Sequence, residues 1–189
     1  PSVLRLLVVG RWTANIIVPE RSMVRSVVTC VESRGAPVLP KRSGSRAVTD
    51  QRGAICGAAT LVVKVGSSSL TLPGGGIDVR RVDDLVDALS EVIAVGRRVV
   101  LVSSGAIATG FPAMGITHRP RTLAGKQAAA SVGQGILLAH YASRFASHGL
   151  RVGQVLLTVN DLVRPTSYRN AWSTLDTLLG LGVVPIVNE

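Results

Sequence analysis

Two short stretches of the sequence join an apolar run to small polar residues and glycine. Residues 61–68 read LVVKVGSS, and residues 99–106 read VVLVSSGA. A buried strand that ends in a Gly/Ser loop presents backbone N–H groups at the edge of a sheet, where anions can be held. Two such edges and one lysine, Lys64, indicate a site that handles phosphate groups.

Lys64 stands inside an apolar run, close to Gly66 and Ser67. Burying an unpaired ammonium group is costly, and a phosphate partner would offset that cost. Gly66 would also let backbone amides approach the same phosphate. The alternative is a lysine whose ammonium group reaches solvent from the end of the strand. The spacing alone leaves both interpretations open.

Ser104 and Gly105 are expected to open a helix directly after a strand. The start of a helix offers N–H groups to a carboxylate or phosphate, and the Ser104 hydroxyl can add to them. The alternative is that Ser104 is only the N-cap of that helix. Asn188 and Glu189 follow another strand-like run, where polar residues are common, and indicate little by themselves.

Several familiar catalytic motifs are absent from the sequence. Residues 105–110 have GxxxxG spacing, but Phe111 and Pro112 follow, so the Lys-Ser/Thr pair of a P-loop is missing. No GxGxxG opens a helix after the first strand, and GxSxG and the protein-kinase signatures HRD and DFG are missing too. Metal-site spacing is also lacking among the three histidines, which we expect at the surface: His118, His140 and His148.

Composition favours a layered α/β protein with an aliphatic core. Hydrophobic residues make up 47% of the 189 residues, but aromatic residues only 3%. Two cysteines outside any CxxC pair indicate free thiols rather than a disulfide framework, and no apolar run approaches the roughly 20 residues that cross a bilayer. The net charge of +10 suits anionic substrates; without interleaved aromatic residues it does not favour nucleic acid.

From residue 58 onward, apolar strands alternate with amphipathic helices. This pattern predicts an α/β fold with a mainly parallel sheet covered on both faces, whose ligands lie at the carboxyl ends of the strands. The predicted strands are Thr60–Val65, Arg98–Val102, Val152–Leu157 and Val183–Val187. The predicted helices start at Asp78, Ser104, Thr122 and Tyr168 and end near Val95, Ala108, Ser147 and Leu179, with loops at Ser67–Gly76 and Pro112–Arg121.

Residues 1–57 lack this regularity. Prolines interrupt them, residues 1–55 hold nine Arg/Lys against three Asp/Glu, and the first methionine is Met23. We expect a basic extension without assigned function, either disordered or lying upstream of a true start near Val48. The predicted domain therefore covers residues 58–189.

Six blocks of sequence, in this order, resemble the glutamate 5-kinases of the amino acid kinase family. The blocks are VVKVGSS at 62–68, VSSGAIATG at 102–110, KQAAASVGQ at 126–134, VGQVLLT at 152–158, YRNA at 168–171 and PIVNE at 185–189. The resemblance implies a three-layer α/β/α sandwich and transfer of the γ-phosphoryl group of ATP, with Mg²⁺, to the side-chain carboxylate of L-glutamate. It also implies a cytoplasmic, homo-oligomeric full-length enzyme in proline biosynthesis, with proline as a possible feedback inhibitor.

The resemblance also implies roles for individual residues. Lys64 would contact the transferring phosphate, with Gly66 and Ser67 in the adjoining phosphate loop. The glutamate would be bound by Ser104, with Gly105 and Ala106 beside it, and by Asn188. No protein ligand for a metal is assigned.

Departures from the family pattern limit these expectations. The segments that follow Asn-Glu in the family, including a nucleotide-binding half, are missing, so we expect a truncated kinase domain that is inactive alone. Ser67 stands where some relatives have threonine, and Arg164-Pro165-Thr166 alters the region associated with proline inhibition. The alternatives are another member of the family, acting on aspartate, N-acetylglutamate or UMP, and a non-catalytic basic protein that binds through residues 1–57.

Overall fold

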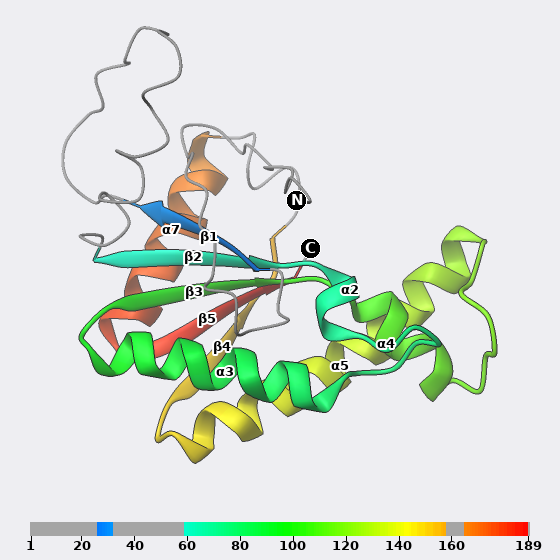
Figure 1. Ribbon diagram of the computed structural model, residues 1–189. Helices are drawn as coiled ribbons and strands as arrows, with labels where there is room; N and C mark the ends of the chain where they lie inside the picture. Colours follow the sequence, from blue (N-terminus) through cyan, green and yellow to red (C-terminus); the bar gives the residue numbers. More distant parts are fainter. Residues whose placement is uncertain (1–25, 32–58, 158–164, 189) are drawn as a thin grey trace, which may run out of the picture.

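Five strands form one sheet in the computed structural model, which describes residues 26–31, 59–157 and 165–188. The strand order is β1-β2-β3-β5-β4 (Figure 1). Strands β2, β3, β5 and β4 run parallel to one another. At the edge of the sheet, β1 pairs antiparallel with β2. The strands are β1 (Ser26–Val31), β2 (Thr60–Val65), β3 (Arg98–Ser103), β4 (Arg151–Val155) and β5 (Val183–Asn188). The predicted mainly parallel sheet is confirmed.

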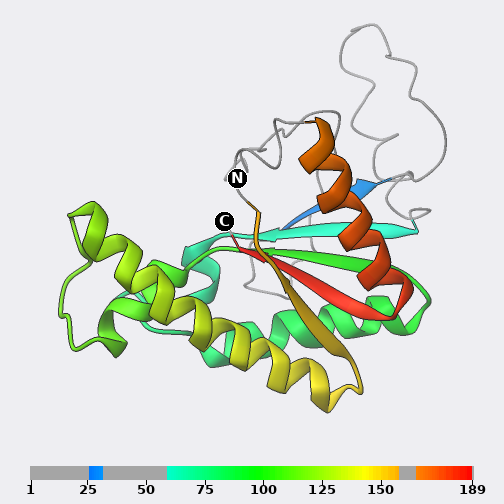
Figure 2. The ribbon, with the colours of Figure 1, turned by 180° about the vertical axis from the view of Figure 1, so that it is seen from behind.

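Helices cover both faces of this sheet, which confirms the predicted three-layer α/β/α sandwich. Helices α3 and α5 lie on one face and α7 lies on the other (Figures 1 and 2). Helix α4 and the beginning of α5 extend beyond the edge at which β2 and β3 end. The helices are α2 (Ser67–Leu70), α3 (Val79–Ala94), α4 (Ala106–Ala113), α5 (Leu123–Ser147) and α7 (Pro165–Gly180).

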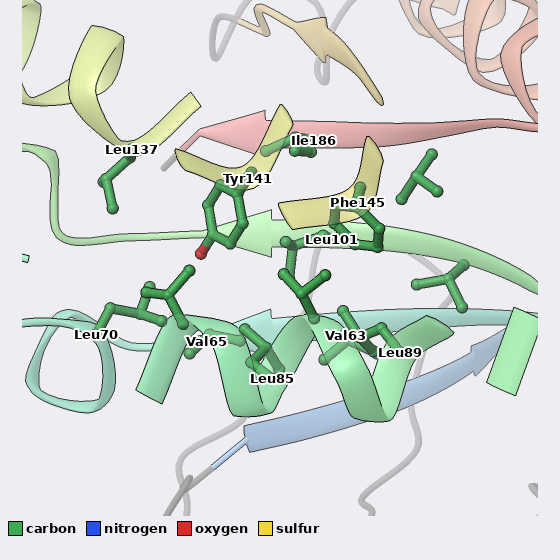
Figure 3. Close-up of a cluster of buried hydrophobic side chains, with 14 of the residues drawn as sticks. Val63, Val65, Leu70, Leu85, Leu89, Leu101, Leu137, Tyr141, Phe145 and Ile186 are labelled. Atoms are coloured by element: carbon green, nitrogen blue, oxygen red, sulfur yellow. The ribbon is translucent and has the colours of Figure 1, made fainter. Parts of the chain in front are cut away.

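The main hydrophobic core lies between the sheet and helices α3 and α5. Alternate residues of β2, β3 and β5 point into it, so Val63 and Val65 of β2 are buried together with Leu85 of α3 (Figure 3). A smaller cluster lies on the α7 face, where the buried members are Val100, Val155 and Val187. The aliphatic core expected from composition is thus concentrated on one face.

Capping residues place the two long helices where the sequence predicted them. The Asp78 carboxylate accepts a hydrogen bond from the Arg81 amide at the start of α3 (3.3 Å). The Thr122 hydroxyl accepts one from the Gly125 amide at the start of α5 (3.1 Å). Gly96 and Gly149, just past the ends of these helices, have positive φ angles, as glycines that stop a helix often do.

Two expected loops contain helical turns, and both differences have local causes. Ser67–Leu70 forms α2, stabilised where the Thr71 amide and hydroxyl both donate to the Ser67 carbonyl (3.0 and 2.8 Å). Helix α4 continues through Pro112 instead of stopping near Ala108. Proline has no N–H for the Ala108 carbonyl, and the Gly76 amide donates to that carbonyl instead (2.8 Å).

One strand comes from the segment to which the sequence assigned no element. Ser26–Val31 pairs along its full length with β2, with Val27 opposite Lys64. Its Val- and Thr-rich sequence suits a strand, but the irregular residues around it hid that preference. The other predictions for residues 1–57, and those for Arg164 and Glu189, fall outside the described residues. Among the described helices, none is long and apolar enough to cross a membrane.

Candidate active site

The carboxyl ends of three neighbouring strands bring the predicted site residues to one edge of the sheet. Val65 of β2 pairs with Ser103 of β3, and Ser103 pairs in turn with Asn188 of β5. The segments that follow β2 and β3 therefore begin side by side, with the end of β5 next to them. The sequence predicted this convergence from the parallel order of the strands.

Lys64 occupies the second-to-last position of β2 and is half-buried. It lies opposite Val102 of β3. Because side chains alternate along a strand, Lys64 shares its face with Val62, which packs against the smaller cluster beneath α7. The lysine thus belongs to the thinly covered face of the sheet, near the carboxyl edge.

Gly66 follows β2 directly and is the N-cap of α2. Its φ and ψ angles of −77° and 156° are ordinary extended values that any residue adopts. A Cβ atom added at Gly66 would meet no atom within 4 Å. Neither backbone strain nor packing in the described chain requires glycine here, and the open space above it is available to a ligand.

Gly105 brings the two predicted loops into direct contact. A Cβ atom at Gly105 would lie 3.4 Å from the Ser67 Cα atom and 3.4 Å from Thr71 Cγ2. Its φ of +105° is a conformation that L side chains rarely adopt. Glycine is therefore favoured at this position by the backbone conformation of the turn, while the distances to the phosphate loop are those of ordinary van der Waals contact.

Ser104 does not cap helix α4, so that alternative for Ser104 is wrong. The N-cap is Gly105, and no side chain caps the helix. The Ser104 amide donates to the Val65 carbonyl instead (3.1 Å), which ties the end of β2 to the turn after β3. Ala106 is the first residue of α4, and the N–H groups of a first turn have no partner within their own helix.

Sequence reasoning missed Tyr141, a buried residue of α5 close to this edge. Its hydroxyl shares a 3.0 Å hydrogen bond with that of Ser103, and Figure 3 shows its ring among the apolar side chains of the main core. Burial raises the pKa of Tyr141 to about 12, so the phenol keeps its proton at neutral pH. The available signal was a lone polar aromatic residue at helical spacing between Leu137 and Phe145.

Asn188 ends β5 with a carboxamide oxygen that is buried and has no hydrogen-bond partner among the described residues. A buried acceptor without a partner costs free energy, and a donor from a ligand would satisfy it. The structure therefore gives Asn188 a feature that its position in the sequence did not predict.

A separate cleft of about 560 Å³ is lined by residues of α2, α3 and α4 and of the loops beside them. Ser67 and Ser68 line it together with Arg81 and the Thr117–Arg119 loop, whereas Lys64, Ser104 and Asn188 do not. Arg81 is already engaged there, because it pairs with Asp78 (Nε–Oδ2, 3.1 Å) and donates to the Ser68 carbonyl (3.2 Å). This cleft shares only Ser67 with the predicted site.

Two of the three histidines pair with aspartates of α3, and the third is exposed. His140 contacts Asp83 (2.9 Å), His148 contacts Asp87 (2.8 Å), and His118 is exposed in the loop before α5. In residues 26–31, 59–157 and 165–188, no group of three or more His, Cys, Asp or Glu side chains is arranged to hold a metal.

An ionic cluster of Asp83, Asp87, His140, Arg144 and His148 ties α3 to α5 away from the site. Arg144 Nε donates to Asp87 Oδ1 (2.9 Å). Hydrogen bonds from Arg144, and then from His148, hold the pKa of the Asp87 carboxyl below its ordinary value. The hydrogen bond to Asp87 likewise raises the pKa of Arg144.

Comparison with known proteins agrees with the fold and the order of the blocks. The model of the amino acid kinase family matches residues 59–189. A glutamate 5-kinase from Cutibacterium acnes is 99% identical over 142 residues, which are 75% of this chain and 36% of that protein. Glutamate 5-kinases from Salinispora arenicola and Bifidobacterium adolescentis are 60% and 57% identical, each over 73% of this chain and 37% of their own length.

The chain thus spans little more than a third of the length of these curated relatives. The family match, by contrast, covers well over half of the chain and includes every described strand and helix except β1. The chain belongs to the amino acid kinase family.

Proposed function

We propose that this chain forms the acceptor-binding part of an enzyme that transfers the γ-phosphoryl group of ATP to the side-chain carboxylate of L-glutamate. The observation that carries the proposal is the convergence of Lys64, the Ser67–Gly105 contact and Asn188 at one carboxyl edge. The names of the similar proteins support glutamate as the acceptor.

The chemistry suits these residues because a carboxylate oxygen is already nucleophilic. No general base has to activate it; the reaction requires that two anions be brought together and their charge neutralised. A lysine and backbone amides supply that neutralisation. Among the described residues that converge at this edge there is no histidine or cysteine, and the proposed reaction needs neither.

Lys64 is proposed to contact the transferring phosphate, with Gly66 and Ser67 lining the phosphate loop. The open space above Gly66 fits this role, since a phosphate could approach the main chain there without meeting a side chain. Bound with ATP, Mg²⁺ would supply further charge neutralisation, held chiefly through phosphate oxygens. Lys64 would act from the side of the sheet that α7 covers only thinly.

Glutamate is proposed to bind between the turn after β3 and the end of β5. The first-turn amides at Ala106 and the Ser104 hydroxyl suit a carboxylate. The carboxamide oxygen of Asn188, which has no partner among the described residues, suits an ammonium group. An α-amino acid carries both groups, so these two features favour an amino acid over a nucleotide such as UMP as acceptor.

Other parts of the proposal rest on the resemblance alone. They are a cytoplasmic location, a homo-oligomeric full-length enzyme, proline as a feedback inhibitor and a place at the start of proline biosynthesis. Activity is proposed for the full-length enzyme, because the chain spans only 36–37% of its relatives.

The test uses the full-length Cutibacterium acnes relative, with substitutions at the positions that match this chain. Lys64→Ala should lower kcat for glutamate phosphorylation about 10²–10³-fold, as loss of a group that stabilises transition-state charge does. The matched control is Arg98→Ala, which removes a cation at the opposite end of the neighbouring strand, where Arg98 pairs with Asp176 (3.5 Å).

A near-normal kcat in Lys64→Ala would remove the proposed role of the lysine. Wild-type enzyme should be assayed in parallel with glutamate, aspartate, N-acetylglutamate and UMP. Turnover of another acceptor in preference to glutamate would overturn the assignment of the substrate while leaving the family assignment intact.

A further inference from the structure

Helices α4 and α5 touch backbone to backbone at the start of α4. A Cβ atom at Gly133 of α5 would lie 1.8 Å from the Ala106 carbonyl oxygen. A Cβ atom at Gly110 of α4 would lie 1.9 Å from the Ala129 carbonyl oxygen. Neither glycine has room for a methyl group, and the neighbours are main-chain atoms that cannot rotate away. The contact at Gly133 therefore fixes how closely Ala106, the first residue of α4, approaches α5.

A second contact from α5 reaches the other side of the same turn. The Ser103 hydroxyl donates to the Ser104 carbonyl (3.4 Å), and it shares a 3.0 Å hydrogen bond with the Tyr141 hydroxyl in which either oxygen can be the donor. Ser103 and Tyr141 are 3% and 1% exposed, which shields this chain of hydrogen bonds from water. It ends on the backbone of Ser104.

The two contacts come from one helix and hold the two ends of one short segment. Gly133 and Tyr141 are eight residues apart, or roughly 12 Å along the helix axis. Between them they contact Ser103 and Ala106, which flank the Ser104–Gly105 turn. Neither contact involves the phosphate loop after β2.

We propose that α5 positions the glutamate-binding turn Ser104–Ala106, with Gly133 and Tyr141 as its positioning residues. The inference rests on the proposed role of that turn in binding glutamate. It predicts that small changes on the inner face of α5 alter recognition of the acceptor much more than recognition of ATP.

Helix α5 contains its own control. Gly135 lies two residues from Gly133, but a Cβ atom there would meet nothing within 4 Å. Gly135→Ala adds the same methyl group to the same helix in open space and removes the same flexible residue. Differences between Gly133→Ala and Gly135→Ala therefore report the contact with Ala106 rather than the change in helix propensity.

The first experiment measures both Michaelis constants in the full-length Cutibacterium acnes relative. Tyr141→Phe deletes only the hydroxyl, and Ser103→Ala deletes its partner. Each should raise KM for glutamate about 3–10-fold, the effect expected for loss of one buried hydrogen bond, while KM for ATP stays within about twofold. The double variant should be little worse than either single variant, because both remove the same interaction.

A purely structural role predicts a different result, namely a lower melting temperature with both Michaelis constants unchanged. That result, or an equal rise in both constants, would overturn the proposal. Gly133→Ala should raise KM for glutamate more than Tyr141→Phe does, and Gly135→Ala should leave it unchanged. If Gly133→Ala fails to fold, the Michaelis constants of Tyr141→Phe and Ser103→Ala still test the proposal.

The second experiment needs no substrate and so separates this inference from the proposed function. Hydrogen–deuterium exchange of the ligand-free full-length relative should be faster in residues 104–110 of Tyr141→Phe than of wild type, with residues 60–65 unchanged. Unchanged exchange in both segments would overturn positioning by α5. If residues 104–110 exchange faster in the variant but the enzyme does not phosphorylate glutamate, positioning by α5 is supported and the proposed function is wrong.

Discussion

The two faces of the central sheet differ in how they are covered. On the face of α3 and α5, a continuous cluster joins both helices to three strands and includes large side chains that are fully buried, such as Tyr141, Phe145 and Leu137. On the face of α7, the buried cluster among the described residues consists of three valines, and the leucines of α7 are only partly buried around it. Both faces belong to the same strands, because successive residues alternate between them.

The two faces therefore have different roles. The face of α3 and α5 holds most of the buried core, and the face of α7 carries the lysine that we propose to bind phosphate. Val63 and Val65 point into the main core beneath α3 and α5. Lys64, which lies between them in the strand, belongs to the opposite face, which α7 covers. A lysine on the α3 and α5 side would have to bury its charge among aliphatic side chains, which is costly. On the face of α7, near the open carboxyl edge, it can meet an anionic ligand. The face of α3 and α5 in turn supplies α5, the helix that we propose positions the acceptor turn.

The largest expected effect compares one leucine on each covering helix. Leu137→Ala in α5 should lower the free energy of unfolding by about 2–5 kcal/mol, because Leu137 is 2% exposed in the main core. Leu178→Ala in α7 should cost clearly less, since Leu178 is only partly buried. Urea unfolding of the full chain measures both. Equal losses would show that the two faces contribute alike and would break the comparison.

A smaller effect on stability is expected for the N-terminal cap of α3, where α3 contacts α2. Asp78 caps α3 and pairs with Arg81, which donates to the Ser68 carbonyl of α2. Asp78→Ala should cost about 1 kcal/mol, the usual loss for an N-cap carboxylate. Asp84→Ala, at an exposed position of the same helix, is the control and should stay within about 0.5 kcal/mol. No difference between the two variants in thermal unfolding would contradict the capping role.

The smallest effect is the pH dependence of the link between α3 and α5. Arg144 and His148 lower the pKa of Asp87, so the folded protein binds a proton at Asp87 less readily than the unfolded chain does. This contribution is present above the ordinary value of 3.8 and is lost as the pH falls through the lowered pKa. Partial exposure of the pair keeps it small.

Asp87→Asn should therefore destabilise the chain at pH 6 and lose that effect progressively below about pH 4. Unfolding free energies of wild type and variant, measured across this range, test the sign. Glu91→Gln, an exposed change on the same helix, serves as the control. A destabilisation that grew toward low pH would show that the sign of this linkage is wrong.

Much of the fold could be predicted because its elements have strong local signals. Strand β2 and helices α3 and α5 were predicted to within one or two residues, since their apolar periodicity and their caps at Asp78 and Thr122 agree. The errors fall where a distant segment decides the outcome. Helix α4 passes through Pro112 because Gly76 supplies the missing donor, and β1 is a strand because β2 is there to pair with it.

The candidate site shows the same division. The order of strands and loops was enough to predict that six site residues lie at one edge of the sheet, and the strand register agrees with that prediction. These residues are Lys64, Gly66, Ser67, Ser104, Gly105 and Asn188. The N-cap at Gly105, the Ser103–Tyr141 hydrogen bond and the burial of the Asn188 oxygen away from any described partner could not be predicted. Each depends on how close two segments come when they are 38 or more residues apart, or on burial that several elements produce together.

By itself, the sequence determined the alternation of strands and helices, the membership of the chain in its family, and the residue types that stand at the strand ends. These follow from local periodicity and from motifs that can be read without coordinates. Only the tertiary structure decided which face of the sheet carries Lys64, which glycine turns the chain into α4, and which helix lies against the acceptor turn. Those features depend on contacts between distant segments, and such contacts exist only once the layers have packed.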